Sequence, residues 1–257
     1  MYDVAALGEL LIDFTCLSTD ADGYPTMAAH PGGAPANYLA ALTKFGAKTA
    51  MIGKVGNDAF GRLLIKTLRG AGIDTRGMLV SDDVFTTLAF VTLDDSGDRE
   101  FSFARKPGAD TQLCYEEIDL GVIDASKVLH FGTLSMTNEP ARDATYRAVE
   151  YAAGHGKLIS FDPNLRKPLW DDLKEAKRQM LWGLQHADVV KISDEETKFL
   201  FGLAPEASAK HIIDSFGVRL VYVTCGADGC FYRTKSASGF VKALSGIAVK
   251  DTTGAGD

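Results

Sequence analysis

The chain has 257 residues, 46% of them hydrophobic and 24% charged, which is enough to bury a large core in one α/β domain with or without an appendage. Lysine and arginine total 27 and aspartate and glutamate total 34, and the resulting charge of −7 argues against binding to nucleic acid through a basic surface. The start "MYDVAALGEL" lacks the pattern of a secretory signal and no apolar run reaches the length of a membrane span, so we expect a cytoplasmic protein with no membrane partner.

Short apolar segments rich in strand-forming residues alternate with amphipathic segments in the first third of the chain. A strand opens the segment 4–14, and a second strand is predicted over 49–56. Helical spacing over 35–46 ends on Gly46, a common helix stop. A second helix is predicted over 58–72, with Asp58 as its N-cap.

The same alternation continues in the second half of the chain. We expect strands over 128–134, 158–162, 188–193 and 220–226, and helices near 140–154, 171–186 and 194–217. Strands that alternate with helices indicate a parallel sheet with helices on both faces. The predicted fold class is therefore α/β.

One region departs from this alternation. Residues 86–106, "TTLAFVTLDDSGDREFSFARK", contain two strands joined by a polar turn, with no helix after them. Residues near 12–30 could add one or two more strands. We interpret the segments 12–30 and 84–108 as a small β appendage, of the kind that often serves as a lid. On pattern alone, an ordinary hairpin at a sheet edge is an equal alternative.

Several common motifs are absent from the sequence. It contains no G-x-x-x-x-G-K-[ST], no G-x-G-x-x-G after the first strand, and neither H-R-D nor D-F-G. These absences exclude a P-loop enzyme and a typical protein kinase, and they disfavour a dinucleotide-dependent oxidoreductase. The four cysteines form no C-x-x-C pair, so we interpret them as reduced thiols: Cys16, Cys114, Cys225 and Cys230.

The last eight residues, "KDTTGAGD" (250–257), combine two glycines with an acidic residue. Gly254 and Gly256 allow a tight turn whose backbone N–H groups, opening onto a helix, would form a site for an anion. A carboxylate beside such a site opposes the anion unless it serves in the reaction, so Asp257 is a candidate general base. An ordinary surface turn is the alternative for such a segment taken alone.

A second glycine cluster, "HPGGAPANYLA" (30–40), precedes a predicted helix. Gly32 and Gly33 would allow a ligand to approach the backbone, and Asn37 offers a donor and an acceptor one turn into the helix. Asp13 lies near the first strand's end, where ligands gather in open α/β sheets, and its carboxylate could hold two sugar hydroxyls. These groups suit a polyol better than an anion, although a tight turn and a turn-forming aspartate would give the same pattern.

Together these segments resemble the ribokinase-like (pfkB-type) carbohydrate kinases, and within them the fructokinases. The resemblance runs from "GELLIDF" through "GGAPAN", "GKVGNDAFG", "REFSFARKPGAD", "FDPNLRKPLW" and "KISDEE" to "DTTGAGD". "GGAPAN" and "DTTGAGD" are the two signatures of the family, and they lie in order at opposite ends. The resemblance implies one domain over residues 1–257, with a three-layer α/β/α body around a mostly parallel sheet and the small β sheet as its lid.

The resemblance also implies where the substrates bind. Asp257 would take the proton from a sugar hydroxyl as it attacks the γ-phosphate of ATP, while the backbone N–H groups of residues 254–256 stabilise the transferred group. Phe101, Phe103 and Arg105 alternate along one predicted strand, so we expect them to share the face that closes over the sugar. The implied catalytic residues are Asp257, Gly254, Ala255 and Gly256, and the implied sugar ligands are Asp13, Gly32, Gly33, Asn37, Phe101, Phe103, Arg105 and Arg166.

The nucleotide and the cations have implied sites as well. Mg²⁺ would accompany ATP, with Glu196 in indirect contact, and a monovalent cation such as K⁺ would bind backbone groups of Asp251 and Thr253. The wider family prefers asparagine where this chain has Ser193. The implied nucleotide ligands are Lys191, Ser193 and Glu196 of "KISDEE", and Thr224, Gly226 and Gly229 of "VTCGADG".

We therefore expect an ATP-dependent sugar kinase, and within that class a fructokinase that makes fructose 6-phosphate. A 2-keto-3-deoxygluconate kinase is the alternative in the same class, because Arg105 and Arg166 could pair with the carboxylate of that sugar. A non-catalytic sugar-binding protein of the same fold is the alternative from another class. We also expect a homodimer through the lids, since exposed strand edges are often covered by another chain, and a protein that continues beyond Asp257.

Overall fold

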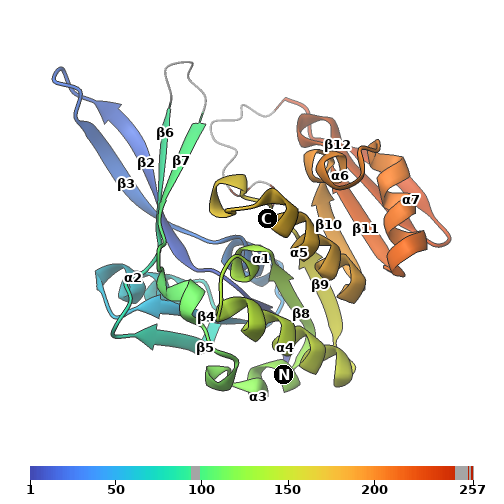
Figure 1. The fold of residues 1–257 in the computed structure, drawn as a ribbon, viewed down its shortest axis with the longest axis horizontal. Coiled ribbons are helices and arrows are strands. Elements are labelled where there is room, and N and C mark those ends of the chain that lie inside the picture. Colours follow the sequence, from blue (N-terminus) through green and yellow to red (C-terminus); the bar gives the residue numbers. More distant parts are fainter. Residues whose placement is uncertain (94–98, 247–253, 255, 257) are drawn as a thin grey trace.

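The computed structural model describes residues 1–93, 99–246, 254 and 256, with the backbone alone at 93 and 99–101. Its strands form two sheets, a large one in the body and a small one that projects from the body (Figure 1). The α-helices are α1 (Ala34–Lys44), α2 (Ala59–Gly70), α3 (Leu120–Asp124), α4 (Ala141–Gly154), α5 (Leu173–His186), α6 (Asp194–Phe201) and α7 (Pro205–Phe216). Short 3₁₀ turns, η1 to η5, lie at Ala109–Gln112, Tyr115–Glu117, Leu134–Met136, Lys167–Leu169 and Gly226–Asp228.

The large sheet has nine described strands and is mostly parallel, which confirms the predicted α/β class. Their spatial order is β13 (Ser238–Lys242), β12 (Gly229–Thr234), β11 (Leu220–Thr224), β10 (Val189–Ser193), β9 (Leu158–Asp162), β8 (Ser126–Gly132), β1 (Tyr2–Leu7), β4 (Thr49–Gly56) and β5 (Asp74–Ser81). Among these strands, the β11–β12 and β12–β13 pairs are antiparallel and the others are parallel. The sequence pattern did not predict β5, β12 or β13.

Helices cover both faces of this sheet because the residues of its central strand alternate between two cores. Val4 and Ala6 of β1 pack in a core with α1 and α2, while Ala5 and Leu7 pack in a second core that also contains residues of α4, α5 and α7. All four side chains are at least nine-tenths buried. Burial of each leucine-sized side chain contributes about 1.5–3 kcal/mol, so the apolar strands hold the three layers together.

Local sequence signals explain where several helices begin and end. The Asp58 carboxylate accepts hydrogen bonds from the N–H groups of Phe60 (2.8 Å) and Gly61 (2.9 Å), which confirms its predicted role as N-cap of α2. The prediction of one helix over 194–217 was wrong. Gly202 adopts a left-handed φ of 67°, which ends α6, and Pro205 then begins α7.

The small sheet consists of four described strands from the two predicted segments. Its order is β3 (Pro25–Gly32), β2 (Leu11–Thr19), β6 (Leu88–Leu93) and β7 (Arg99–Ala104). The β6–β7 and β2–β3 pairs are antiparallel, and β2 and β6 run parallel between them. The predicted hairpin and the additional strands are therefore confirmed. We call these four strands the lid sheet, and its function as a lid stays a prediction.

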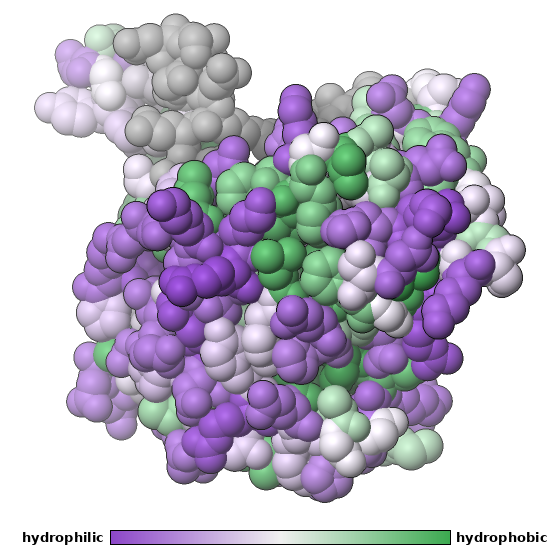
Figure 2. Space-filling view, turned by 45° about the vertical axis from the view of Figure 1, so that its right-hand side comes forward, coloured by the Kyte–Doolittle hydropathy of each residue, from purple (hydrophilic) through white to green (hydrophobic). Residues whose placement is uncertain are grey.

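The outer surface is mostly polar. Figure 2 shows one face on which hydrophilic side chains surround a band of hydrophobic ones. Large exposed hydrophobic side chains include Leu17 and Tyr24 on the lid sheet and Phe240 and Val241 on β13. In the described part of the chain, no helix is both long enough and apolar enough to cross a membrane. The four cysteines are free, as predicted.

Candidate functional site

A cavity of about 410 Å³ lies where the lid sheet meets the large sheet. Its lining comes from the segments that follow five neighbouring parallel strands, β1, β8, β9, β10 and β11, together with α1 and the lid sheet. The lining residues are Glu9, Leu11, Asp13, Gly33, Ala34, Asn37, Val91, Phe103, Leu134, Asn164, Leu165, Arg166, Lys167, Lys191, Ser193, Glu195, Glu196, Phe199, Thr224, Gly254 and Gly256.

The topology accounts for this position. From β1 the chain first builds the sheet outward through β4 and β5, and then returns to add β8 and its successors on the other side of β1. The strand order therefore reverses between β1 and β8. In open α/β sheets such a reversal leaves a crevice outside the carboxyl ends of the strands, which is where ligands bind.

One end of the cavity is formed by the residues that we expected to bind a sugar. Asp13 lies on β2, and Asn37 lies in the first turn of α1. Gly33 has a φ of 114°, and a Cβ there would lie 2.5 Å from the Glu9 carbonyl oxygen, so only glycine fits. Gly32 does not line the cavity in the described structure, but a Cβ on it would lie 2.1 Å from Asp13 Oδ2. Because Gly32 has no side chain, the Asp13 carboxylate can lie against its backbone without a clash.

Glu9 is a cavity residue that the sequence analysis missed. It follows β1, is only 2% exposed, and accepts a hydrogen bond from the Ala34 N–H at the start of α1 (2.9 Å). This bond caps a helix whose N-cap residue, Gly33, has no side chain to do so. Burial raises the pKa of Glu9 to about 7, and the nearby Asp110 carboxylate also raises it, while hydrogen bonds and Arg105 act in the opposite direction.

The other end of the cavity carries a lysine beside the C-terminal glycines. Lys191 Nζ lies 3.0 Å from Asp162 Oδ2, and a Cβ placed on Gly256 would lie 3.3 Å from the same Nζ. Gly254 has a left-handed φ of 71°, as the predicted tight turn requires. Both glycines line the cavity. Ala255 and Asp257, and the predicted cation ligands Asp251 and Thr253, lie outside the described residues.

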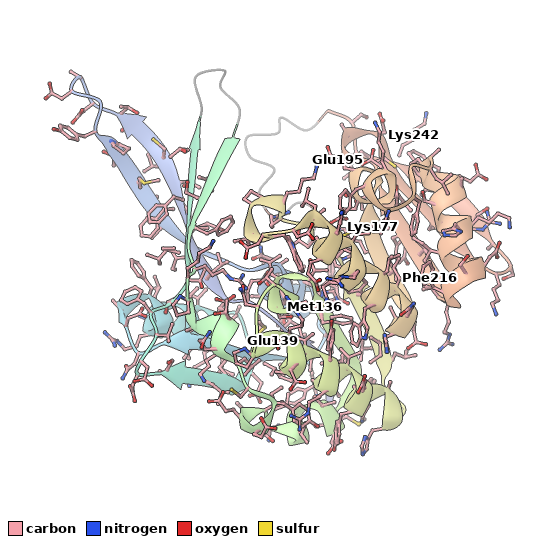
Figure 3. The ribbon with its side chains drawn as sticks, viewed as in Figure 1. Met136, Glu139, Lys177, Glu195, Phe216 and Lys242 are labelled. Carbon is pink, nitrogen blue, oxygen red and sulfur yellow. The ribbon has the colours of Figure 1, made fainter. Side chains whose placement is uncertain are left out.

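Ser193 and Glu196 form a reciprocal cap at the start of α6. The Ser193 N–H donates to Glu196 Oε2 (2.8 Å), and the Glu196 N–H donates to Ser193 Oγ (3.2 Å). The second Glu196 oxygen accepts from the Leu165 N–H (2.7 Å), which holds the segment after β9 and so the neighbouring Arg166 at the cavity. Figure 3 labels Glu195 near this helix start. Both Glu196 oxygens are therefore occupied by hydrogen bonds, which is compatible with an indirect role at a cation.

The predicted nucleotide loop lies partly at the cavity. Thr224, the last residue of β11, lines it. Gly226 lies in η5 and Gly229 begins β12, and neither lines the described cavity. Gly229 has a φ of 128°, and a Cβ there would lie 2.1 Å from the Val241 carbonyl oxygen, so this glycine allows β12 and β13 to pair closely.

Arg105 differs from the predicted arrangement. Phe103 lines the cavity, but Arg105 follows the end of β7, is buried, and does not line the cavity in the described structure. Its guanidinium forms an ion pair with Asp110 (Nη2–Oδ2 2.7 Å) and is not turned to the face expected for a sugar ligand. The side chain of Phe101 lies outside the described residues, so its predicted contact stays a prediction.

Beneath the cavity lies a buried polar cluster that carries no charge. His130 of β8 stacks on Tyr38 of α1, with ring centroids 4.1 Å apart, and its Nδ1 lies 3.0 Å from Ser160 Oγ. Burial, together with the charge of Lys191, lowers the pKa of His130 to about 3, so the ring stays neutral. A neutral, buried imidazole is a packing element here and a poor candidate for the general base. Among the described residues, no group of three or more His, Cys, Asp or Glu could hold a metal ion.

Comparison with known proteins gives consistent matches over the whole chain. The model of the pfkB family carbohydrate kinases matches residues 1–257. The chain is 42% identical to "Probable fructokinase-4" of Arabidopsis thaliana over 258 residues, which is 99% of this chain and 78% of that protein. Its fold is similar to that of fructokinase from Xylella fastidiosa with bound ATP (TM-score 0.88, 30% identity, 98% of this chain and 77% of that one). It is also similar to a putative ribokinase II from E. coli in complex with ATP and Mg²⁺ (TM-score 0.89, 30% identity, 100% and 82%).

Proposed function

Because the chain belongs to the pfkB family of carbohydrate kinases, we propose that it is a fructokinase, which transfers the γ-phosphate of ATP to D-fructose and releases fructose 6-phosphate and ADP. The observation that supports this most is the cavity, in which Asp13 and Asn37 share one space with Lys191 and Gly254. Phosphoryl transfer needs an acceptor and a phosphate donor held together in one orientation. The hydroxyls of the sugar would lie against the first pair and the phosphates of ATP against the second.

In this proposal the residues of the chain position the reactants and stabilise charge. Asp257 removes the proton from the attacking hydroxyl, and the backbone N–H groups of residues 254–256 donate to the oxygens of the phosphoryl group in transfer. The Lys191 ammonium, which lies beside Gly256, offsets the negative charge that collects there. Arg166 donates paired hydrogen bonds to the sugar or the phosphates from the opposite wall.

The charges of the cavity favour a neutral sugar over an acidic one. Asp13 lines the end where the sugar would lie, and a substrate carboxylate beside it would be repelled. Arg105, which could have compensated, is already paired with Asp110, so Arg166 alone of the two arginines lines the cavity. Together with the fructokinase relatives, this supports D-fructose in preference to 2-keto-3-deoxygluconate.

ATP, Mg²⁺ and a monovalent cation complete the proposal. The Xylella fastidiosa fructokinase has bound ATP, and the E. coli putative ribokinase II has ATP and Mg²⁺, which supports both for this chain. Mg²⁺ would be held by the phosphates of ATP, with Glu196 contacting it through water because both of its oxygens accept N–H groups. We keep Asp251 and Thr253 as the proposed backbone ligands of K⁺.

We further propose a homodimer through the lid sheets. β3 and β7 are the edge strands of the described lid sheet, and Leu17 and Tyr24 near its tip are 65% and 70% exposed. Pairing with a second copy would cover both the edges and these side chains. Light scattering at micromolar concentration should give twice the mass of one chain, and a monomer mass would contradict the proposal.

A coupled ADP-release assay tests the proposed activity. The protein, expressed from its complete reading frame, is given ATP and Mg²⁺ with D-fructose or with 2-keto-3-deoxygluconate. Turnover on fructose supports the proposal, and a preference for the acidic sugar contradicts it. Asp257→Asn should lower kcat by roughly 10²–10⁴-fold while thermal stability stays unchanged. Full activity in that variant would remove Asp257 from the role of general base.

A further inference from the structure

Arg105 and Asp110 form a buried ion pair at the base of the lid sheet. Arg105 follows β7 directly, and Asp110 lies in η1. Their side chains are 3% and 2% exposed. Asp110 Oδ2 accepts from Arg105 Nε (2.9 Å) and lies 2.7 Å from Nη2, so two nitrogens of the guanidinium contact one carboxylate oxygen. A pair this well enclosed holds its partners in one geometry.

The second oxygen of Asp110 reaches the other strand of the same hairpin. Asp110 Oδ1 accepts a hydrogen bond from Thr87 Oγ1, and Thr87 immediately precedes β6. The Thr87 carbonyl in turn accepts from the Ile12 N–H on β2 (3.1 Å). Ile12 is the neighbour of the cavity residue Asp13. One carboxylate therefore joins the bases of β6 and β7 and, through Thr87, that of β2.

The other N–H groups of Arg105 reach the large sheet. Nη1 donates to Thr137 Oγ1 (2.7 Å) and Nη2 donates to the Leu134 carbonyl (2.8 Å). Both partners lie in the segment that follows β8, and Leu134 lines the cavity. Figure 3 labels Met136 of this segment and Glu139 just beyond it, in the middle of the view near the start of α4. The guanidinium is thus a bridge between the lid sheet and the crevice at the strand-order reversal.

Phe103 is the residue of the lid sheet whose position at the cavity would depend on this bridge. It lies on β7, two positions before Arg105 in the chain. Phe103 lines the main cavity and also a neighbouring one of about 400 Å³, in whose wall Arg105 lies. A change in the Arg105 contacts would therefore move the aromatic ring that closes one side of the cavity.

We propose that Arg105 and Asp110 are positioning residues, which hold the lid sheet against the crevice and so set Phe103 and Leu134 around the sugar without touching it. The inference rests on the proposed fructokinase function. It replaces the direct sugar contact predicted for Arg105. If the lid is displaced, water reaches the γ-phosphate, and ATP is hydrolysed without sugar.

The test is a double-mutant cycle on the full-length protein. Arg105→Lys keeps the charge but loses the planar guanidinium that contacts Asp110, Thr137 and Leu134 together, and Asp110→Asn keeps the shape but loses the charge. Thr137→Val removes one hydrogen bond of the bridge and leaves the ion pair intact, so it remains informative if the others fold poorly. Arg147→Lys and Glu116→Gln are the control, because this pair joins α4 to η2 and lies away from the cavity.

We expect Arg105→Lys and Asp110→Asn each to raise the KM for fructose about 10- to 100-fold and to raise the share of ATP hydrolysed without sugar. Thr137→Val should raise the same two quantities by a smaller factor. The double variant should be no worse than the worse single variant, because both act through one bridge. The control pair should change neither quantity.

Three results would overturn the inference. If the variants have lower thermal stability but an unchanged KM for fructose and an unchanged share of ATP hydrolysed without sugar, the ion pair only stabilises the fold. A raised KM in Arg105→Lys with none in Asp110→Asn or Thr137→Val would indicate direct sugar contact. If the wild type turns over no sugar, the proposed function fails, and hydrogen exchange then decides this inference separately: faster exchange of the lid strands in Arg105→Lys supports it, and unchanged exchange overturns it.

Discussion

Replacing Glu9 by glutamine should change how the stability of the protein depends on pH. Burial raises the pKa of this carboxyl from 4.5 to about 7, so the folded state holds the proton at pH values where the unfolded chain has lost it. The stability that the protonated form provides is complete below pH 4.5 and is lost as the pH rises through 7. The difference between the two pKa values corresponds to about 3 kcal/mol of unfolding free energy, of which about 2 kcal/mol falls between pH 5.5 and 8.5.

Glutamine keeps the oxygen that accepts the Ala34 N–H but cannot ionise. The unfolding free energy of Glu9→Gln, minus that of the wild type, should therefore rise by about 2 kcal/mol from pH 5.5 to pH 8.5. Urea denaturation at four pH values measures this difference, in which the other titrating groups cancel. Glu150→Gln, an exposed position on α4, is the control and should give parallel curves. Parallel curves for Glu9→Gln as well would refute the reasoning.

The remaining predictions concern a turn, a charge and a cap. Gly254→Ala and Gly156→Ala both place alanine at φ 71°, and each should lower the unfolding free energy, measured by chemical denaturation, by about 1–2 kcal/mol. Only Gly254→Ala should also lower kcat, by about tenfold or more. Equal kcat in the two variants would show that Gly254 takes no part in phosphoryl transfer. Lys191→Met should raise the KM for ATP and lower kcat, while the affinity for the sugar, measured by calorimetry, stays unchanged. Unchanged KM for ATP and kcat would exclude a contact between Lys191 and the phosphates of ATP. Asp58→Ala removes four hydrogen bonds, two of them from Thr86, and should lower the unfolding free energy by about 2 kcal/mol. Burial alone would raise the pKa of Asp58, but these hydrogen bonds outweigh it and lower the pKa. The loss of unfolding free energy in Asp58→Ala should therefore shrink as the pH falls below 4, and a loss independent of pH would refute this.

The repeating pattern of strands and helices predicted the layered fold and the small sheet, because apolar periodicity reflects which face of each element is buried. β12 and β13 escaped detection since their side chains are largely half-exposed or exposed and carry little periodic signal. Motif chemistry pointed to Asp13 and Asn37, which both line the cavity, while their role as sugar ligands stays a prediction. It missed Glu9, because an isolated glutamate in a sequence is typical of a surface.

Arg105 shows a different limit of sequence reasoning. Alternation along the predicted strand placed it on one face with Phe103, but β7 ends at Ala104, and the Asp110 carboxylate that pairs with the guanidinium lies in the segment after the strand. Asp110 gave no signal in "KPGAD" that it would be buried. Which charges pair inside a protein depends on the way distant segments pack, and a single sequence carries little record of that packing.

The place of β1 inside the large sheet, between β4 and β8, has a consequence for the synthesis of the protein on the ribosome. The first strand made can pair with β4 as soon as residue 56 has emerged, but its other edge must wait for β8. Asp13 and Asn37, proposed to hold the sugar, are made early, whereas Lys191 and Gly254, proposed to face the phosphates, are made much later. A nascent chain can therefore carry the first part of the proposed sugar site well before the phosphate end has been made.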